Sequence, residues 1–496
     1  MKYFSTRNKN LNFNFKDVFL RGLAPDGGLF IPQKLKIYNS SELKKLSNLK
    51  YTDLATEIIS NFCAPDLEKN KLKALVEKAY KGFDSKDVVT IKKIGNLNLL
   101  ELYHGPTLAF KDIAMQVIGN IYNEFNSSDK KTVNIIVATS GDTGSAAISA
   151  LNGKSNINVF VLHPHNKISN IQRKIMTTIG SNNTYNIAIK GSFDDCQKIV
   201  KDMFNENEFR EKINMSGVNS INWARIICQI VYYFYAAFKF NNKKINFAVP
   251  TGNFGDVYAG YIAKKMGLGI DKLIVATNEN DILQKVINTG EYQPGQVKPS
   301  LSPSMDIQVS SNFERLLFDV VGEDDKRVSL LMNDLSAKGF FKLNKEEVEI
   351  VKKDFCAEKI NDKDTLSIIK DIDSKSNFII DPHTATAVGA AKKINNLSNT
   401  VVLGTAHPYK FLETVKMATG KEVKPPIQLS KIEDKEEKYD ILENDISKIK
   451  NYILEKIAWV AKSSARLLNL FVECPFIHFQ VILFFEHKLF NLIQRS

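Results

Sequence analysis

The feature that most constrains the fold is an alternation, from about residue 90 onward, of short apolar runs with helical patterns. The runs are rich in Val and Ile, as buried strands are, and most of them end in a polar turn that leads into helical spacing. The expected strands are residues 99–103, 133–138, 159–162, 185–189, 247–249, 273–276, 378–380 and 401–403. This alternation predicts an α/β fold with a mostly parallel sheet. Ligands in such folds bind beyond the carboxyl ends of the strands, where these turns lie.

The charge balance and the cysteines exclude several functions. Net charge is +12, but only nine of the 67 basic residues are arginine, and the lysine-rich runs alternate with Leu and Val as on solvated helix faces. No arginine-rich or aromatic-interleaved patch stands out, so nucleic-acid binding is not expected. The five cysteines are scattered and form no CxxC pair, so we expect neither a disulfide framework nor a metal site.

The two ends of the chain predict a cytoplasmic protein without a membrane anchor. Residues 1–15 contain no continuous apolar core and no cleavage pattern typical of a signal peptide. Residues 468–485 are about long enough to span a bilayer, but Glu473, Pro475 and His478 interrupt them, so a membrane helix is disfavoured.

Three regions are expected along the chain. Residues 1–90 form a small N-terminal domain, residues 91–457 form the main α/β domain, and residues 458–496 form an atypical apolar tail. The tail is either a docked or partner-facing amphipathic segment or a non-native extension, and the sequence leaves both open.

Lys111 is the strongest candidate for covalent chemistry. It lies in the segment HGPTLAFKD, where an expected strand passes through a Gly-Pro turn into a helix. The first turn of a helix has positive potential, and partial burial there favours loss of the lysine proton. A neutral lysine amine can form a Schiff base with an aldehyde such as that of pyridoxal phosphate (PLP). The alternative is an ordinary solvated lysine.

Two further turns could bind anions. Residues 252–256, GNFGD, follow an expected strand and open a helix, so that glycines and N-terminal amides could cradle a phosphate. The turn is not a G-x-x-x-x-G-K-[ST] loop, which disfavours a magnesium-nucleotide site. We expect Asp256 to cap its helix rather than face a phosphate that it would repel. Residues 138–144, ATSGDTG, form a similar turn, which could bind an anion or simply carry a helix cap at Asp142 or Thr143.

Two arginine-containing segments are candidates for a substrate phosphate. They are residues 222–225, which include Asn222 and Arg225, and residues 172–174, which include Arg173. A guanidinium group matches the geometry of phosphate oxygens. An ion pair at a surface or interface is an equally acceptable interpretation of either arginine.

Five segments of the chain resemble threonine synthases, a PLP-dependent family with the tryptophan-synthase-β-like fold (PLP fold type II). They are HGPTLAFKD at 104–112, SGDTG at 140–144, PTGNFGD at 250–256, PSMDI at 303–307 and GTAHPYKF at 404–411. The segments fall in the family's order, and the resemblance covers roughly residues 1–457. It implies two open, mostly parallel α/β subdomains, which together bind PLP, plus the small N-terminal domain.

The resemblance also implies roles for individual residues. Lys111 would bind PLP and act as the catalytic residue. The other cofactor-binding residues would be Gly252, Asn253, Phe254, Gly255 and Asp256 at the phosphate and Thr405 at the pyridine nitrogen. The substrate-binding residues at the α-carboxylate would be Ser140, Gly141, Asp142 and Thr143. Asn222 and Arg225 of the arginine-containing segment remain the candidates for the substrate phosphate. His407 and the segment 381–384 are expected to be structural.

The reaction implied by the resemblance is the conversion of O-phospho-L-homoserine and water to L-threonine and phosphate, catalysed by a monomer or homodimer. The nearest alternative is another enzyme of the same fold, either a serine or threonine dehydratase or a β-replacement synthase. Those enzymes usually carry an SxGN-type loop, whereas this chain has SGDTG. A second alternative is a non-catalytic relative that binds a phosphorylated metabolite, and the intact Lys111 argues against it.

Overall fold

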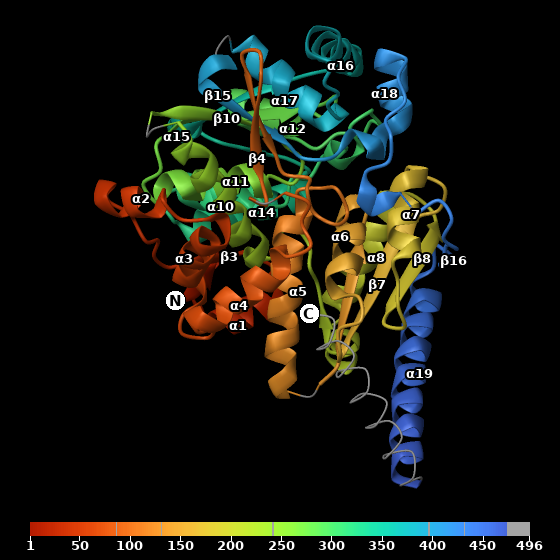
Figure 1. The fold of residues 1–496 in the computed structure, drawn as a ribbon. Coiled ribbons are helices and arrows are strands. Elements are labelled where there is room, and N and C mark those ends of the chain that lie inside the picture. The colour runs from red at the N-terminus through yellow and green to blue at the C-terminus, as the bar shows by residue number, and fades with distance from the viewer. Residues whose placement is uncertain (86, 130, 241–242, 395–396, 431, 474–496) are drawn as a thin grey trace. The chain divides into compact units, whose positions relative to one another are not determined.

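A computed structural model describes residues 1–85, 87–129, 131–240, 243–394, 397–430 and 432–473 (Figure 1). The chain divides into two compact units, Met1–Ile441 and Leu442–Ser496. All of the predicted site residues lie in the first unit.

The N-terminal region combines a small antiparallel sheet with helices. The sheet has the strand order β2-β1-β3. Its elements are β1 (Tyr3–Ser5), β2 (Asn8–Phe13), α1 (Phe15–Arg21), β3 (Phe30–Pro32), α2 (Ser40–Leu46), α3 (Tyr51–Cys63) and α4 (Lys69–Tyr80). Its core is continuous with the rest of the unit, because Phe19 of α1 packs on Tyr122 and Phe125 of the long helix α5 (Lys111–Asp129). The domain boundary near residue 90 stays a prediction.

The larger sheet has six strands in the order β14-β11-β10-β15-β5-β4. The strands are β4 (Thr90–Ile94), β5 (Leu97–Glu101), β10 (Ile245–Pro250), β11 (Ile270–Thr277), β14 (Phe355–Lys359) and β15 (Thr400–Gly404). All neighbours are parallel except β4 and β5. Phe247 and Val249 of β10 belong to one apolar cluster and Ala248 to another, so both faces of the sheet are buried.

A smaller parallel sheet contains β8 (Thr184–Lys190), β7 (Ile157–Pro164), β6 (Val133–Ala138) and β9 (Met215–Ser216), in that order. Helices α6 (Asp142–Leu151), α7 (Asn170–Thr178) and α8 (Phe193–Asn205) follow β6, β7 and β8, and the short helix α9 (Asn207–Lys212) precedes β9. The two mostly parallel sheets confirm the predicted α/β fold with two subdomains.

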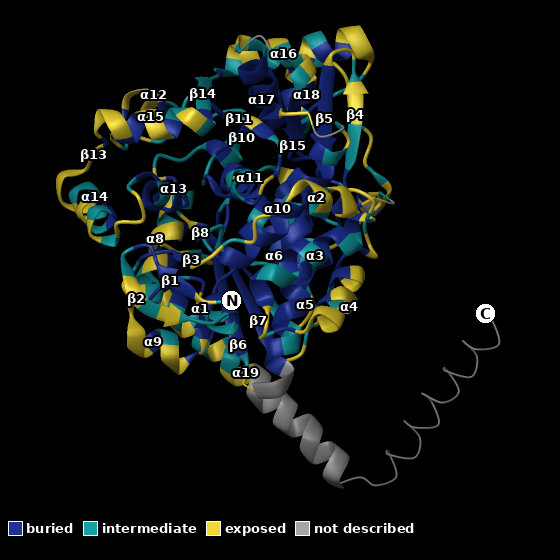
Figure 2. Cartoon of the chain, turned by 90° about the vertical axis from the view of Figure 1, so that its left-hand side faces the viewer, coloured by how far each residue is buried: buried dark blue, intermediate teal, exposed yellow. Residues whose placement is uncertain are grey.

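Helix α10 (Trp223–Phe238) is the most deeply buried long helix of the first unit's described residues. Its sequence, WARIICQIVYYFYAAF, is apolar or aromatic except at Arg225 and Gln229, as expected of a helix enclosed by other elements. It packs against α3, α5 and α11 (Gly255–Lys265), and Figure 2 shows it in the colour of buried residues.

The remaining elements of this unit are helices, 3₁₀ turns and short strands. Helix α17 (Pro382–Lys393) packs on β10, β11 and β15. The others are α12 (Ile282–Thr289), β12 (Glu291–Tyr292), η1 (Pro303–Met305), α13 (Phe313–Val320), α14 (Asp325–Lys338), β13 (Phe341–Lys342), α15 (Lys345–Asp354), α16 (Asp362–Ser376), η2 (Leu397–Asn399), η3 (Pro408–Phe411), α18 (Leu412–Thr419) and η4 (Ile427–Leu429), followed by β16 (Asp440–Glu443), which crosses the unit boundary.

One expected strand, 378–380, is wrong. These residues are an irregular segment between α16 and α17, although Ile380 is buried in an apolar cluster. Three apolar residues can be buried without strand pairing, and Asp381 and Pro382 start a helix immediately afterwards.

The second unit contains helix α19 (Ile446–Glu473). The expected start of the tail at residue 458 falls within this helix, and residues 474–496 lie outside the described part of the chain. Within the described residues, no helix combines the length and apolarity that crossing a membrane requires.

Candidate active site

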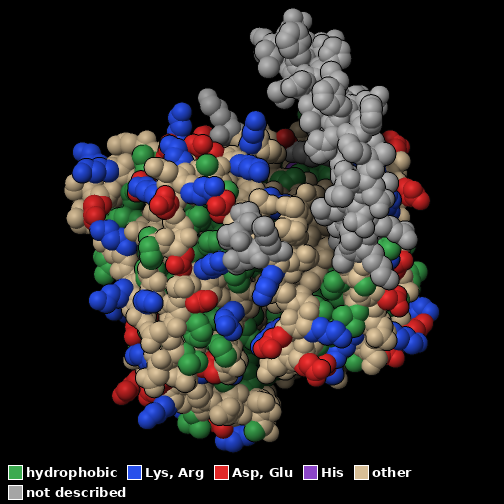
Figure 3. All heavy atoms as spheres, turned by 90° about the horizontal axis from the view of Figure 1, so that it is seen from below, with side chains coloured by type: hydrophobic (Ala, Val, Ile, Leu, Met, Phe, Trp, Pro, Cys, Tyr) green, Lys and Arg blue, Asp and Glu red, His purple; other side chains and the backbone are tan. Residues whose placement is uncertain are grey.

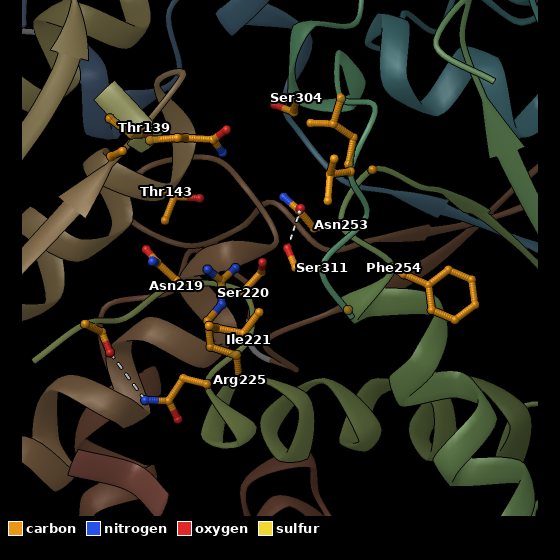
Figure 4. Close-up of a pocket in the computed structure, with 18 of the residues that line it drawn as sticks. Thr139, Thr143, Asn219, Ser220, Ile221, Arg225, Asn253, Phe254, Ser304 and Ser311 are labelled. Carbon is orange, nitrogen blue, oxygen red and sulfur yellow. Dashed lines mark hydrogen bonds between the residues drawn. The ribbon is translucent and has the colours of Figure 1, made fainter. Parts of the chain in front are cut away.

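The turns after β6, β10 and β15 and the start of α5 line one cavity of about 700 Å³. Its walls include Lys111, Asp142, Arg225, Asn253 and Thr405. In Figure 4, Thr139 and Thr143 lie on one side of the cavity and Asn253, Ser304 and Ser311 on the other, while Arg225 lies below Asn219, Ser220 and Ile221. The fold therefore brings the turns predicted from sequence together at the carboxyl ends of strands from both sheets.

Lys111 is the first residue of α5, as the sequence predicts. Its side chain is 12% exposed, and its Nζ lies 3.5 Å from Asp142 Oδ2 and 4.9 Å from the centre of the Phe110 ring. Burial lowers the pKa of Lys111, and the nearby cations Arg225 and Lys410 act in the same direction. Asp142 acts in the opposite direction, and the net effect is that the partly desolvated amine loses its proton more readily than an exposed lysine, as a Schiff-base lysine must.

Asp142 is buried between two lysines. Its Oδ1 lies 2.6 Å from Lys410 Nζ and accepts a 2.9 Å hydrogen bond from Gln172 Nε2, while its Oδ2 faces Lys111. Despite burial, Lys410 and Lys111 hold the pKa of Asp142 far below its usual range. An ionised carboxylate repels a substrate carboxylate, so the role predicted for this side chain at the α-carboxylate is disfavoured.

The cap of helix α6 differs from both sequence-based candidates. Gly141 is the N-cap residue, and the hydroxyl of Thr139 accepts hydrogen bonds from the amides of Gly141 and Gly144, each 2.9 Å long. Gly141 has φ = 132°, and a Cβ there would lie 2.7 Å from the Gln172 side chain. Because Thr139 satisfies these donors, the Asp142 side chain is left to pair with the lysines.

The turn 252–256 presents its backbone to the cavity. Phe254 adopts the left-handed conformation, with φ = 64°, at the N-terminus of α11. Its ring points away from the cavity in Figure 4 and packs on Phe313 and Phe355. Ser311 donates a 3.0 Å hydrogen bond to Asn253 Oδ1, and a Cβ at Gly252 would lie 2.8 Å from the Ser304 carbonyl oxygen. A helix N-terminus held open in this way is suited to a phosphate.

The expectation that Asp256 caps α11 is wrong. The residue lies inside the first turn, and its Oδ1 accepts hydrogen bonds from the hydroxyls of Tyr232 and Tyr233, 2.5 and 2.9 Å long. Its Oδ2 is buried without a partner. Burial raises the pKa of Asp256 to about 6, so protonation there can reduce its repulsion of an anion.

Arg225 lines the cavity from α10. Its side chain is buried, Nη1 donates a long 3.4 Å hydrogen bond to the Val218 carbonyl, and Nε has no partner. Burial lowers its pKa to about 10, so the group remains a cation. A buried, largely unpaired guanidinium at a cavity wall is a strong site for an anion.

Asn222 and Arg173 have structural roles in the chain. The Asn222 side chain caps α10 by accepting from the Ala224 amide and donates to the Phe19 carbonyl, although the residue also lines the cavity. Arg173 forms a two-contact ion pair with Glu437, 2.8 and 3.0 Å long. The ion-pair interpretation is therefore confirmed for Arg173.

Of the predicted residues near the end of β15, one lines the cavity and the others make structural contacts. Thr405 lines the cavity, and its carbonyl accepts from the Phe110 amide at 2.9 Å. Asp381 caps α17 by accepting from the His383 amide, which confirms the predicted turn and cap. His407 Nδ1 accepts from the Tyr409 amide, and burial lowers its pKa to about 4, consistent with a structural histidine.

Lys410 is the residue of this site that sequence reasoning missed. Its side chain is fully buried, and Nζ contacts both Asp142 and the Thr107 carbonyl oxygen, the latter at 2.9 Å. The segment GTAHPYKF contains it six residues after the end of β15. A lysine within a strand-end turn rich in site residues was the available signal.

The described residues fit PLP. Lys111 offers a largely buried amine whose pKa is lowered by burial, and phosphate donors are available at Arg225 and the backbone of 252–256. No group of three or more His, Cys, Asp or Glu side chains that could hold a metal occurs within the described part of the chain.

Three family models match the chain. Residues 2–80 match "Threonine synthase N terminus", residues 96–334 match "Pyridoxal-phosphate dependent enzyme" and residues 384–453 match "Threonine synthase, C-terminal".

Curated relatives and solved structures agree with these models. A threonine synthase from Pseudomonas aeruginosa is 42% identical over 459 residues, which cover 91% of this chain and 98% of the relative. A threonine synthase from Saccharomyces cerevisiae is 40% identical over 504 residues, with 92% and 98% coverage. The crystal structure of PLP-bound threonine synthase from Brucella melitensis superposes with a TM-score of 0.88 at 40% identity and covers 92% of this chain and 99% of its own.

Proposed function

The chain belongs to the threonine synthase family of PLP-dependent enzymes, and we propose that it converts O-phospho-L-homoserine and water to L-threonine and phosphate. The observation that carries the proposal is the buried amine of Lys111 in a cavity that also contains Arg225 and the turn 252–256. The substrate and PLP both carry a phosphate group. The cavity offers a cationic side chain and backbone amides as donors for these two phosphates.

PLP supplies an aldehyde for Lys111 and a ring that accepts the negative charge left when a substrate carbon loses its proton. The turn 252–256 would hold the cofactor phosphate through backbone amides, since the Phe254 ring is directed elsewhere. Thr405 lines the cavity beside Ala406 and would face the pyridine nitrogen with a neutral hydroxyl.

Lys111 would act as the base of the reaction once the substrate amine has displaced it. Its amine would take the proton from Cα of the substrate, pass it to the cofactor and, neutral again, take a proton from Cβ, and phosphate would leave from Cγ. Lys111 would return that proton to Cγ. Water would then add its hydroxyl group at Cβ, its remaining proton would leave with the phosphate, and the proton held by the cofactor would return to Cα. Because the bond broken joins carbon to a phosphate oxygen, the enzyme would be a carbon–oxygen lyase.

The substrate would be oriented by its two anionic ends. We assign the α-carboxylate to the backbone and hydroxyls of Ser140 and Thr143, and no longer to the Asp142 side chain, whose charge is of the same sign. Arg225 is the candidate for a phosphate, since its guanidinium has a free, buried Nε.

The setting of the enzyme is also a proposal. Cys63, Cys196 and Cys228 are buried free thiols, which supports a reducing compartment such as the cytoplasm. On the face drawn in Figure 3, lysine and arginine side chains are interspersed with acidic ones, which supports a small molecule rather than a nucleic acid as the ligand. A monomer and a homodimer are both compatible with the proposal.

Phosphate release from O-phospho-L-homoserine by the purified, PLP-loaded full chain tests the proposal. Serine and threonine are offered separately, with release of ammonia and keto acid measured. Phosphate and L-threonine formed in equal amounts from phosphohomoserine support the proposal. Keto acid formation from serine or threonine alone would favour a dehydratase, and PLP binding without turnover of any of the three would favour a non-catalytic relative.

A further inference from the structure

Lys410 is a buried cation placed directly behind the cavity. Its side chain has no exposed area, and its Nζ contacts Asp142 Oδ1 at 2.6 Å and the Thr107 carbonyl oxygen at 2.9 Å. A fully buried ammonium group is costly unless a charge compensates it, so a specific partner is required. That partner, Asp142, is itself 4% exposed and lines the cavity.

The same carboxylate faces Lys111 from its other oxygen. Asp142 Oδ2 is 3.5 Å from Lys111 Nζ, so that Asp142 lies between two lysine side chains. Gln172 Nε2 donates to Oδ1 at 2.9 Å, and Ser304 Oγ is 3.4 Å from Oδ2. These contacts fix the carboxylate in one orientation, with one oxygen for each lysine.

The other ionisable side chains near Lys111, Asp142 and Lys410 are on four elements. The positive charge of Arg225 on α10 lowers the pKa of Lys111. Lys111 in turn lowers the pKa of Asp256 on α11, against the larger effect of burial. His383 of α17 lines the same cavity. Asp112 of α5 lies near Lys410 but accepts from the Thr107 amide and hydroxyl, and burial raises its pKa to about 6.

A single buried carboxylate can offset only one buried cation. If Asp142 had Lys111 as its sole lysine partner, the low-dielectric surroundings would hold Lys111 as an ammonium ion. An ammonium ion has no lone pair and cannot attack a carbonyl carbon. In the structure a second lysine, Lys410, also contacts Asp142, and its positive charge compensates the negative charge of that carboxylate.

We propose that Lys410 is a positioning residue that neutralises Asp142 and thereby leaves the amine of Lys111 free to lose its proton and condense with an aldehyde. In this condensation the Lys111 nitrogen forms a double bond to the aldehyde carbon, the carbonyl oxygen leaves as water, and the two hydrogens of the neutral amine leave with it. The identity of the aldehyde as PLP rests on the proposed function, whereas the effect of Lys410 on the Lys111 amine does not.

The first test measures the titration of Lys111 directly. The full chain, freed of cofactor, is labelled with acetic anhydride at a series of pH values, and the extent of labelling at Lys111 is read by mass spectrometry. Lys410→Met removes a cation close to Asp142, so the titration midpoint of Lys111 should rise by about 1–3 pH units. Lys410→Arg keeps the charge and should leave the midpoint within about half a unit of the wild type.

Two further variants separate charge from structure. Asp142→Asn leaves Lys111 facing Lys410 and Arg225 without a carboxylate between them, so its midpoint should fall below the wild-type value. The double variant Asp142→Asn/Lys410→Met carries no buried charge at either position, so its midpoint should lie above that of Asp142→Asn alone. This second comparison measures the same effect of Lys410 should Lys410→Met alone fail to fold. Lys416→Met, at an exposed position on α18, is the control for loss of a lysine.

The second test follows the rate at which each variant captures added PLP, through the absorbance of the Schiff base, across the same pH range. Lys410→Met should require a higher pH for half-maximal capture, and Lys410→Arg should restore the wild-type profile. Equal Lys111 midpoints in the wild type and Lys410→Met, or in Asp142→Asn and the double variant, would overturn the proposal. A wild-type chain that never captures PLP would instead overturn the proposed function, while the labelling result would still decide the role of Lys410.

Discussion

Asp142 Oδ2 lies 3.5 Å from Lys111 Nζ, across the cavity wall where α6 and α5 begin. Lys111 begins α5 ten residues after β5 ends, and Asp142 begins α6 four residues after β6 ends. The two helices pack against each other and bring the amine and the acid to the same cavity wall. The reactivity of Lys111 therefore depends on how α5 and α6 pack, and not only on the local sequence around the lysine.

Replacing Lys111 by Ala should abolish turnover while the chain still folds. The variant removes the amine that binds the aldehyde and moves the substrate protons, so we expect activity to fall at least about 10²-fold and the Schiff-base absorbance to disappear. Circular dichroism and phosphate release check the two parts. Lys345→Ala, at an exposed position that begins α15, is the matched control and should retain both signals. Normal turnover by the Lys111 variant would refute its assignment.

Substitution of Arg225 should weaken substrate or cofactor binding, whereas the same substitution of Arg173 should not. Arg225→Met removes a buried guanidinium with a free Nε from the cavity, so KM for phosphohomoserine or the Kd for PLP should rise about 10- to 100-fold. Arg173→Met breaks a partly exposed ion pair with Glu437 and should change either constant less than about threefold. Steady-state kinetics and a PLP titration decide which phosphate Arg225 binds. Unchanged constants for Arg225→Met would remove it from both sites.

The position of Lys111 was predictable because the signal is local. A strand, a Gly-Pro turn and a helical pattern occur within about twenty residues, and the structure places the lysine at the first helical position. The turn 252–256 was predictable for the same reason, since its glycines and the following helical pattern are contiguous. The alternation of strands and helices also indicated the parallel sheets.

What the sequence did not reveal depends on contacts between distant segments. Lys410 acquires its role from Asp142, and Asp256 loses its expected capping role to Tyr232 and Tyr233 of another helix. Spacing along the chain contains no information about such partners. The prediction of a strand at 378–380 was wrong for a different reason. Three apolar residues are too few to distinguish a strand from a buried irregular segment.

Asp256 should make stability depend on pH. Its pKa is about 6 in the folded chain, above its ordinary value of 3.8, so the folded state keeps a proton that the unfolded state loses in this window. The contribution of Asp256 to stability is therefore fully present below pH 4 and decreases as the pH rises to 6. Asp256→Asn keeps an acceptor for the two tyrosines but does not titrate. The unfolding free energy of the wild type relative to this variant should fall by up to about 3 kcal/mol between pH 4 and 6.5. Urea unfolding at four pH values measures it, and a constant difference would show that the carboxyl group is not protonated in the folded state.

Gly141 should tolerate substitution far less than another glycine of positive φ. At Gly141, φ is 132° and a Cβ would lie 2.7 Å from Gln172, which itself holds Asp142. At Gly153, φ is 68° and no heavy atom lies within 4 Å of the added Cβ, so Gly153→Ala isolates the cost of the left-handed backbone, about 1–2 kcal/mol. Gly141→Ala adds a clash to an even less favourable conformation and should cost about 1–3 kcal/mol more.

Because relief of the clash displaces Gln172 and with it the Asp142 carboxylate, Gly141→Ala should also shift the pH at which Lys111 captures PLP, whereas Gly153→Ala should not. If Gly141→Ala and Gly153→Ala lost equal stability and captured PLP with equal pH profiles, the loop around Gly141 would accommodate a Cβ without strain. Gln172 would then not hold the Asp142 carboxylate in place.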